Sequence, residues 1–205
     1  MSTLEQSLDR EVDSYLKLIE SKPEVKNLQN GTVSLNIYRK FLKTFYIVEH
    51  LSHKAVTKAG QKTASLDPYL SKRFHLCAKG ELGHAEIALK DLSDLGEKDF
   101  ELSNRQTVDE YDDFLQKHAD NYPLGILGHS YLFENVSAIL FPRGEPLDFP
   151  SKFIEVHAKE DPGHSQAIKK TVRHVEKGLS DDDIKKIIGI TRESGDHLLK
   201  VFETV

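Results

Sequence analysis

The sequence predicts an all-α protein, and three observations lead to this fold class. Apolar residues recur at three- and four-residue spacing almost throughout the chain, which is the period of a helix with one buried face. No stretch of four to eight residues alternates apolar and polar side chains as a half-buried strand does. Proline, glycine and capping residues divide the periodic stretches into segments of helical length. We therefore expect six or so packed helices.

The first three predicted helices are bounded by clear start and stop signals. The first covers roughly residues 3–21 and ends before Pro23, because proline biases the preceding residue away from helical geometry. The second covers residues 34–60 and is closed by a glycine. The third covers residues 67–95 and begins with an aspartate cap followed by Pro68 at the first helical position.

The second half of the chain predicts three more helical segments. One begins near Val108 and bends or breaks at Pro123, which leaves a separately aimed segment that ends before Pro142. The next covers roughly residues 149–177. The last starts after Ser180, which reads as a cap followed by an acidic first turn, and reaches the C-terminus.

Length and composition predict one soluble globular domain over residues 1–205. The chain matches the usual ~100–200 residues per domain, and no linker, internal repeat or low-complexity tract divides it. Hydrophobic residues make up 38% and charged residues 30%, which excludes collagen-like and disordered classes. No apolar run approaches the ~20 residues that a bilayer requires, so no membrane association is expected.

Charge and cysteine content indicate the compartment and the partners. The net charge is -5, and the basic residues are interspersed with acidic ones, so nucleic acid is not an expected partner. The single cysteine, Cys77, excludes an intramolecular disulfide. The first residues, MSTLEQSLDREVDS, have neither an apolar signal core nor an arginine-rich transit face. We expect a cytoplasmic protein, with a homodimer as the commonest default for soluble oligomers.

Three predicted helices carry carboxylate or imidazole groups in the middle of an otherwise apolar face. Burying such groups without partners costs several kcal/mol each, so something must compensate them together. At ~100° per residue, the three such residues of the 149–177 helix fall within an arc of about 60°, and the pair in the 67–95 helix is equally close. The six residues are Glu81, His84, Glu134, His157, Asp161 and His164.

This set of side chains predicts a dinuclear metal centre. Three carboxylates carry a charge of -3, which two ferrous ions nearly neutralise. Mixed imidazole and carboxylate ligation suits iron or manganese better than zinc in a thiolate cage or calcium in an oxygen cage. Helical bundles build dinuclear carboxylate sites from such elements. We therefore predict two iron ions per chain, with manganese as the other candidate metal.

Spacing statistics single out one of the motifs. With 10 histidines and 33 acidic residues in the chain, about 1.6 acidic-x-x-His matches are expected by chance, and two occur, so that motif carries no information. The spacing of His157, Asp161 and His164 is expected only about 0.08 times by the same arithmetic. This triplet is therefore the more specific signal.

At these residues the sequence resembles the heme-oxygenase-like diiron oxidases and oxygenases. EVHAKEDPGHSQ resembles the His-x-x-x-Asp-x-x-His helix of that family, KGELGHAEIALKDL its Glu and His helix, and YLFENVSAIL its lone glutamate. The resemblance runs over most of the chain and implies a compact bundle of about seven helices. It also implies that all six residues named above ligate the metals.

The resemblance implies a non-heme diiron enzyme that activates O₂ to oxidise a small organic acid, amino acid or amine. Heme oxygenase proper carries its proximal histidine in the first helix, whereas no histidine here precedes His50. Thiaminase II (TenA) uses a cysteine nucleophile, for which Cys77 is the candidate in this chain, and pyrroloquinoline quinone synthase works without metal. The alternatives are a metal-free enzyme of this fold, either a cofactor-independent oxidase or a thiaminase II-like enzyme, and a non-catalytic helical binding protein.

Several residues admit a second interpretation. Asp161 precedes Pro162-Gly163 and could cap a new helix, and Glu81 with His84 could be a satisfied polar pair of the core. Glu49 and His53, four residues apart, form a further possible ligand pair. Some aromatic residues could wall a substrate pocket, although plain core is the simpler interpretation: Phe41, Phe45, Tyr46, Tyr131 and Phe133. No role is assigned to the other histidines, which are His50, His75, His118, His129, His174 and His197.

Overall fold

The computed structural model describes residues 3–97, 105–141 and 146–203, and these residues form eight α-helices and no β-strand. The all-α prediction is therefore confirmed, with one helix more than the seven or so expected. The helices are α1 (Leu4–Glu20), α2 (Pro23–Gln29), α3 (Leu35–Thr63), α4 (Pro68–Asp94), α5 (Arg105–Asn121), α6 (Gly125–Leu140), α7 (Lys152–Val175) and α8 (Asp181–Glu203), with the short 3-10 helix η2 (Glu176–Gly178) between the last two.

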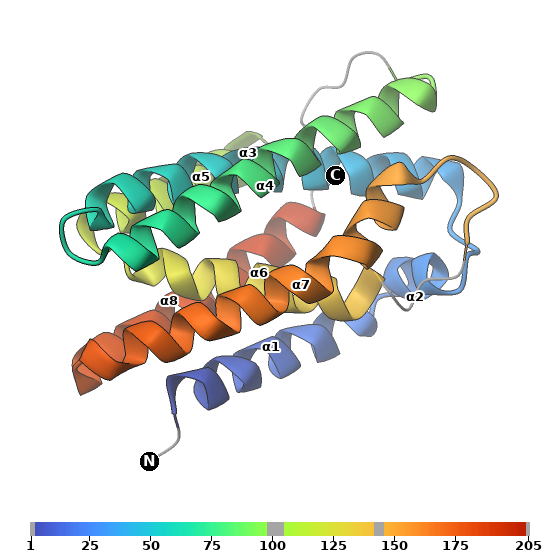
Figure 1. Ribbon diagram of the computed structural model, residues 1–205. Helices are drawn as coiled ribbons and strands as arrows, with labels where there is room; N and C mark the ends of the chain where they lie inside the picture. The colour runs from blue at the N-terminus through green and yellow to red at the C-terminus, as the bar shows by residue number, and fades with distance from the viewer. Residues whose placement is uncertain (1–2, 98–104, 142–145, 204–205) are drawn as a thin grey trace.

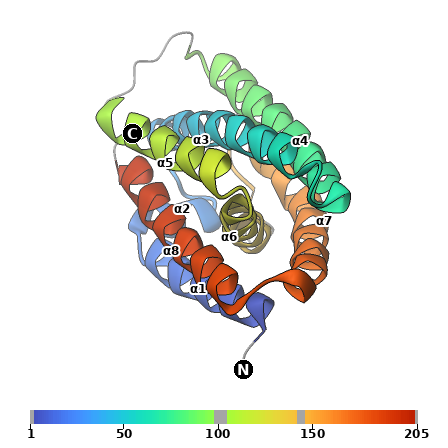
Figure 2. The same cartoon turned by 90° about the vertical axis from the view of Figure 1, so that its left-hand side faces the viewer.

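The other long helices surround α6, which runs through the middle of the bundle (Figure 2). α3 and α4 lie antiparallel and side by side along one side of the molecule, and α1 and α7 lie along the opposite side (Figure 1). α6 is buried at every position from Gly125 to Ser137 except Glu134. Glu134 of α6 therefore carries a carboxylate that lies between the α3–α4 pair and α7.

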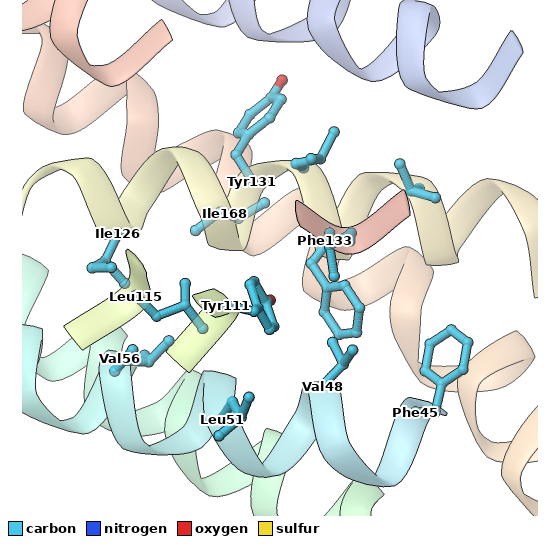
Figure 3. Close-up of a cluster of buried hydrophobic side chains, with 14 of the residues drawn as sticks. Phe45, Val48, Leu51, Val56, Tyr111, Leu115, Ile126, Tyr131, Phe133 and Ile168 are labelled. Atoms are coloured by element: carbon cyan, nitrogen blue, oxygen red, sulfur yellow. The ribbon is translucent and has the colours of Figure 1, made fainter. Parts of the chain in front are cut away.

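The core is one connected cluster of apolar side chains contributed by the long helices. Figure 3 shows part of it, where Phe45 and Val48 of α3 face Phe133 of α6 and where Tyr111 of α5 fills the space beside them. The described residues include no helix that is both long and apolar enough to span a bilayer.

Side-chain caps start several helices where the sequence predicts them. Asp67 accepts a hydrogen bond from the Leu70 amide at 3.0 Å, with Pro68 at the first helical position of α4. At the start of α8, the Ser180 hydroxyl accepts from the Asp183 amide and the Asp183 carboxylate accepts from the Ser180 amide, both at 3.2 Å. These reciprocal bonds satisfy amides that a helix start leaves without a partner.

One proline has a role that the sequence analysis did not expect, and another confirms the expectation. α1 ends at Glu20, before Pro23 as predicted, but Pro23 also begins the short helix α2, because proline fits the first turn of a helix. Pro162 lies inside α7, which continues through it from Lys152 to Val175 as the predicted 149–177 helix requires. Asp161 is consequently a mid-helix residue and not the cap of a new helix, so its side chain points sideways into the bundle.

Candidate metal centre

Seven carboxylate and imidazole side chains converge inside the bundle, and six of them are the residues predicted from the sequence. The seventh is Glu49 of α3, which lies beside them with no solvent exposure. The predicted six divide among three helices as the helical spacing requires. They are Glu81 and His84 of α4, Glu134 of α6, and His157, Asp161 and His164 of α7.

The first group of ligand atoms joins α3, α4 and α7. One ligand atom from each of Glu49, His84 and His157 lies within 4.8 Å of the other two. The Nε2 atom of His157 is 3.5 Å from Oε1 of Glu49, and the rings of His84 and His157 are 4.1 Å apart. Two histidines and one carboxylate on one face of a cavity are a ligand set typical of non-heme iron.

The second group joins α4 and α7 and reaches α6. One atom each of His84, Asp161 and His164 again lies within 4.8 Å of the others. The Nδ1 atom of His164 is 3.8 Å from Oδ1 of Asp161 and 3.4 Å from Oε2 of Glu134. The side chain of His164 is 35% exposed and that of Glu134 is 12% exposed, so these two residues form the edge of the cluster that faces solvent.

The third group contains Cys77, which the sequence analysis named only as the candidate nucleophile of a thiaminase II-like enzyme. Cys77 lies one turn before Glu81, and its thiol is 3.5 Å from Oε1 of Glu81 and 3.7 Å from Oε1 of Glu134. One ligand atom from each of Cys77, Glu81 and Glu134 lies within 4.8 Å of the other two, as in the first two groups. Burial raises the pKa of the Cys77 thiol, and the neighbouring carboxylates raise it further, so the sulfur is held as a neutral thiol.

A hydrogen-bond chain fixes the orientation of His157. Its Nδ1–H donates to the carbonyl of Phe153 at 2.7 Å, and since a carbonyl only accepts, Nε2 is left with a free lone pair directed at the cluster. The amide of Phe153 donates in turn to the buried carboxylate of Asp91 at 2.8 Å. Asp91 of α4 thereby caps the start of α7, for which Ser151 provides no side-chain cap. No local sequence pattern indicates this contact, because 62 residues separate the partners.

The cluster leaves ligand atoms without hydrogen-bond partners, which is the observation that tests whether a metal fits. Buried polar groups are normally paired, because an unpaired one costs about 1–3 kcal/mol and an unpaired charge costs more. A divalent cation would satisfy all of these atoms at once, and the donor set of oxygens and imidazole nitrogens suits iron or manganese. The unpartnered atoms are both carboxylate oxygens of Glu49, Oε2 of Glu81, Nε2 of His157 and Oδ2 of Asp161.

Burial and mutual repulsion shift the pKa values of Glu49, Asp161 and His84 so that their uncharged forms are favoured, whereas His164 is shifted towards its protonated form. Burial raises the pKa of Glu49 to about 8 and that of Asp161 to about 7. Burial, together with the neighbouring imidazoles, lowers the pKa of His84 to about 3, which keeps the ring neutral and able to ligate. A hydrogen bond to Glu134 raises the pKa of His164 to about 9. Without cations, the cluster therefore retains protons that ligation would have to displace.

Other residues considered from the sequence lie apart from the cluster. His53 does not join Glu49, because it belongs to none of the groups of ligand atoms that lie close together among the described residues; its Nδ1 is bonded to the backbone carbonyl of Ala78 at 2.7 Å. His129 is buried between the hydroxyls of Ser52, at 3.0 Å, and Ser194, at 2.6 Å. It is a satisfied core histidine, in agreement with the absence of an assigned role.

Comparison by sequence gives no match to a protein-family model or to a curated protein. Comparison by structure gives several. A TenA homologue from Pyrococcus furiosus has a TM-score of 0.80 at 13% identity, with 98% of each chain covered. A TenA homologue from Pseudomonas syringae has a TM-score of 0.74 at 14% identity, covering 97% of this chain and 90% of that one.

A third solved structure, from Shewanella denitrificans, is described as a domain of unknown function with a heme oxygenase-like fold. Its TM-score is 0.74 at 20% identity, and the match covers 98% of this chain and 89% of that chain. Identities this low establish likeness of fold and not of activity. The described residues thus have the all-α, heme-oxygenase-like fold that this chain shares with TenA homologues.

Proposed function

We propose that this protein is a non-heme diiron oxidase or oxygenase that uses O₂ to oxidise a small organic acid, amino acid or amine. The observation that carries the proposal is the buried cluster of seven ligating side chains with five unpartnered ligand atoms. A satisfied polar core would pair these atoms internally, whereas a metal-binding core leaves them directed at a shared volume.

The charges of the cluster match two divalent cations. Glu49, Glu81, Glu134 and Asp161 supply four negative charges when ionised, and the three histidines ligate as neutral rings. Two ferrous ions carry four positive charges, so a cluster that includes Glu49 is neutral when loaded. When bound, the two ions supply the electrons that reduce O₂ and the oxidising power that acts on the substrate.

The protein residues provide geometry and exclusion of water. Phe153 and Asp91 hold the His157 ring in one orientation and one tautomer, so that Nε2 needs no rearrangement to ligate. Five of the seven side chains are at most 8% exposed, which keeps bulk water from most of the centre. The solvent edge at Glu134 and His164 is the side from which O₂ can enter without unfolding the bundle.

Anaerobic titration with Fe(II) tests the proposal, followed by measurement of the O₂ consumed. The wild-type protein should bind two ions per chain and consume O₂. His157→Ala should lose iron binding and O₂ uptake while the helical circular dichroism stays unchanged. His174→Ala, at a histidine of the same helix outside the cluster, should behave as wild type. Unchanged O₂ uptake in His157→Ala, or no iron binding by the wild type, would overturn the proposal.

A metal-free, thiaminase II-like enzyme is the second candidate, and two observations favour it. The solved structures with similar folds include TenA homologues, and the Cys77 thiol lies between two carboxylates that could accept its proton. The raised pKa of this thiol opposes the reading, because the thiolate is the nucleophile.

Cys77→Ser separates the two candidates. The diiron proposal predicts that this variant retains O₂ uptake after iron loading, since the ligands of the first and second groups are untouched. The thiaminase II-like candidate predicts metal-independent hydrolysis of thiamine by the wild type and its loss in Cys77→Ser. A protein with neither activity and no iron uptake would instead be the non-catalytic binding protein.

A further inference from the structure

A mostly apolar cavity of about 410 Å³ lies between α1, α2, α3, α6 and α8, and Ile154 of α7 also lines it. This volume is within the range of small-molecule binding sites, roughly 300–1,000 Å³. Three aromatic residues that the sequence favoured as plain core, Phe41, Phe45 and Phe133, line it together with Leu132, Val136 and Phe141. A concave space of this size with a mostly apolar wall is typical of a small-molecule binding site.

The cavity wall is mostly apolar, and two of its hydroxyls are already bonded to backbone carbonyls, whereas the hydroxyl of Tyr15, another lining residue, has no hydrogen-bond partner. The Thr44 hydroxyl donates to the carbonyl of Lys40 at 3.1 Å, and the Ser137 hydroxyl donates to the carbonyl of Phe133 at 3.0 Å. The charged groups lie at the rim, where Lys22 pairs with Glu203 at 2.7 Å. A ligand with polar groups along its body would lose its bonds to water and gain few in return.

The inner end of the cavity adjoins the candidate metal centre. The ring of Phe141, which lines the cavity, is 5.0 Å from the ring of His157. Phe45, another lining residue, is 5.1 Å from Phe153, whose ring is 4.0 Å from that of His157. One layer of side chains thus separates the cavity from the ligating groups.

We propose that this cavity binds the apolar body of the substrate, an unbranched alkyl chain or aromatic ring system of about ten carbon atoms with one polar head. That the bound molecule is then oxidised rests on the proposed function, whereas the binding itself does not. The wall disfavours sugars, nucleotides and polar heterocycles as occupants, because it is mostly apolar and offers them few free hydrogen-bond partners. The cavity therefore narrows the organic acid or amine to its apolar members.

Calorimetric titration of the metal-free protein with decanoate and decylamine tests the binding. A burial of about 0.8 kcal/mol per methylene corresponds to an increase in affinity of about fourfold per methylene. Decanoate should consequently bind more than a hundredfold more tightly than hexanoate, with a negative heat-capacity change. The two ten-carbon probes differ in head group, so binding of both indicates recognition of the chain and binding of one indicates recognition of its head as well.

Two cavity-filling variants locate the site. Leu140→Trp on α6 and Leu199→Trp on α8 each place a large side chain at a half-buried lining position, and each should weaken decanoate binding at least tenfold. Ile139→Trp is the matched control, because Ile139 is half-buried on the same helix but does not line the cavity. Circular dichroism and iron uptake should be unchanged in all three, which shows that the fold and the metal centre remain intact.

The outcomes separate this inference from the proposed function. Absence of binding by either ten-carbon probe at 1 mM, equal affinity for hexanoate and decanoate, or full binding in both cavity-filling variants would refute the cavity as the binding site. Chain-length-dependent binding by a protein that takes up no iron would leave the cavity standing and remove the diiron proposal. Iron uptake by a protein that binds neither ten-carbon probe would support the diiron proposal and refute the cavity as the binding site.

Discussion

Glu49→Gln should stabilise the metal-free protein while weakening metal binding. The pKa of Glu49 is about 8 in the fold against an ordinary value of 4.5. Because the folded-state pKa is raised, the group's contribution to stability is complete below pH 4.5 and is lost as the pH rises towards 8. At about 1.4 kcal/mol per pKa unit, holding this carboxyl protonated costs about 3 kcal/mol at pH 7 and about 1 kcal/mol at pH 5. Glutamine has the shape of the protonated acid and avoids that cost.

Thermal unfolding of the metal-free variant and wild type at the two pH values measures the effect. For a chain of this size, the gain corresponds to a Tm increase of roughly 6–12 °C at pH 7 and about 2–4 °C at pH 5. Glu86→Gln, at an exposed position of α4, is the control and should change Tm little at either pH. Iron-loaded protein should show the opposite order, with the variant less stable. A gain in Tm that does not depend on pH, or a loss at pH 7, would refute the reasoning.

Three further predictions follow from the same structure. Since the pKa of Asp161 is about 7, Fe(II) binding at pH 7 should release protons, and the affinity for Fe(II) should rise between pH 6 and pH 8. Calorimetric titrations in buffers of different ionisation enthalpy detect the released protons. Identical heats in all buffers would contradict this prediction. Asp91→Asn should lower the free energy of unfolding by about 1–2 kcal/mol and weaken iron binding, because it alters the cap of α7. An unaltered iron affinity would show that Asp91 contributes to the stability of the fold and not to metal binding. Gly128→Ala should cost about 1–3 kcal/mol in urea unfolding, because a Cβ there would lie 2.2 Å from Oγ1 of Thr191, whereas Gly83→Ala, with open space around it, should be neutral or stabilising.

The helices could be predicted because their signals are local. Each long helix begins and ends within about three residues of its predicted bound, since caps, prolines and glycines act on their immediate neighbours. The short helix α2 was missed, because Pro23 is equally compatible with ending one helix and beginning another. The continuity of α7 through Pro162 agrees with the predicted 149–177 helix, although the Asp-Pro-Gly sequence also allowed a new helix to begin there.

The candidate metal centre was predictable in part. A polar residue that interrupts an apolar helix face can be recognised from the sequence of that helix alone. This pattern indicated the six predicted side chains, which lie close together in the structure. Glu49 was named from the sequence only as part of a possible further ligand pair with His53, and the structure places Glu49 but not His53 in the cluster. One signal was present: Glu49 is the sole acidic residue between Leu35 and Thr63, in a helix that is otherwise apolar, neutral or basic.

The cavity and the cap at Asp91 could not be predicted from the sequence. Phe41, Phe45 and Phe133 have the spacing of ordinary core residues, and only the relative placement of five helices leaves a space between them. Asp91 bonds to an amide 62 residues away, a separation at which no periodic pattern operates. Both features arise from tertiary packing and could be found only in three dimensions.

An anomalous difference map at the iron absorption edge, from crystals loaded with Fe(II) without oxygen, tests the central claim most directly. The account predicts two peaks inside the bundle, one within bonding distance of Nε2 of His157 and the other among the ligand atoms of Asp161 and His164. A map with no internal peak, or with iron only at surface carboxylates, would contradict it.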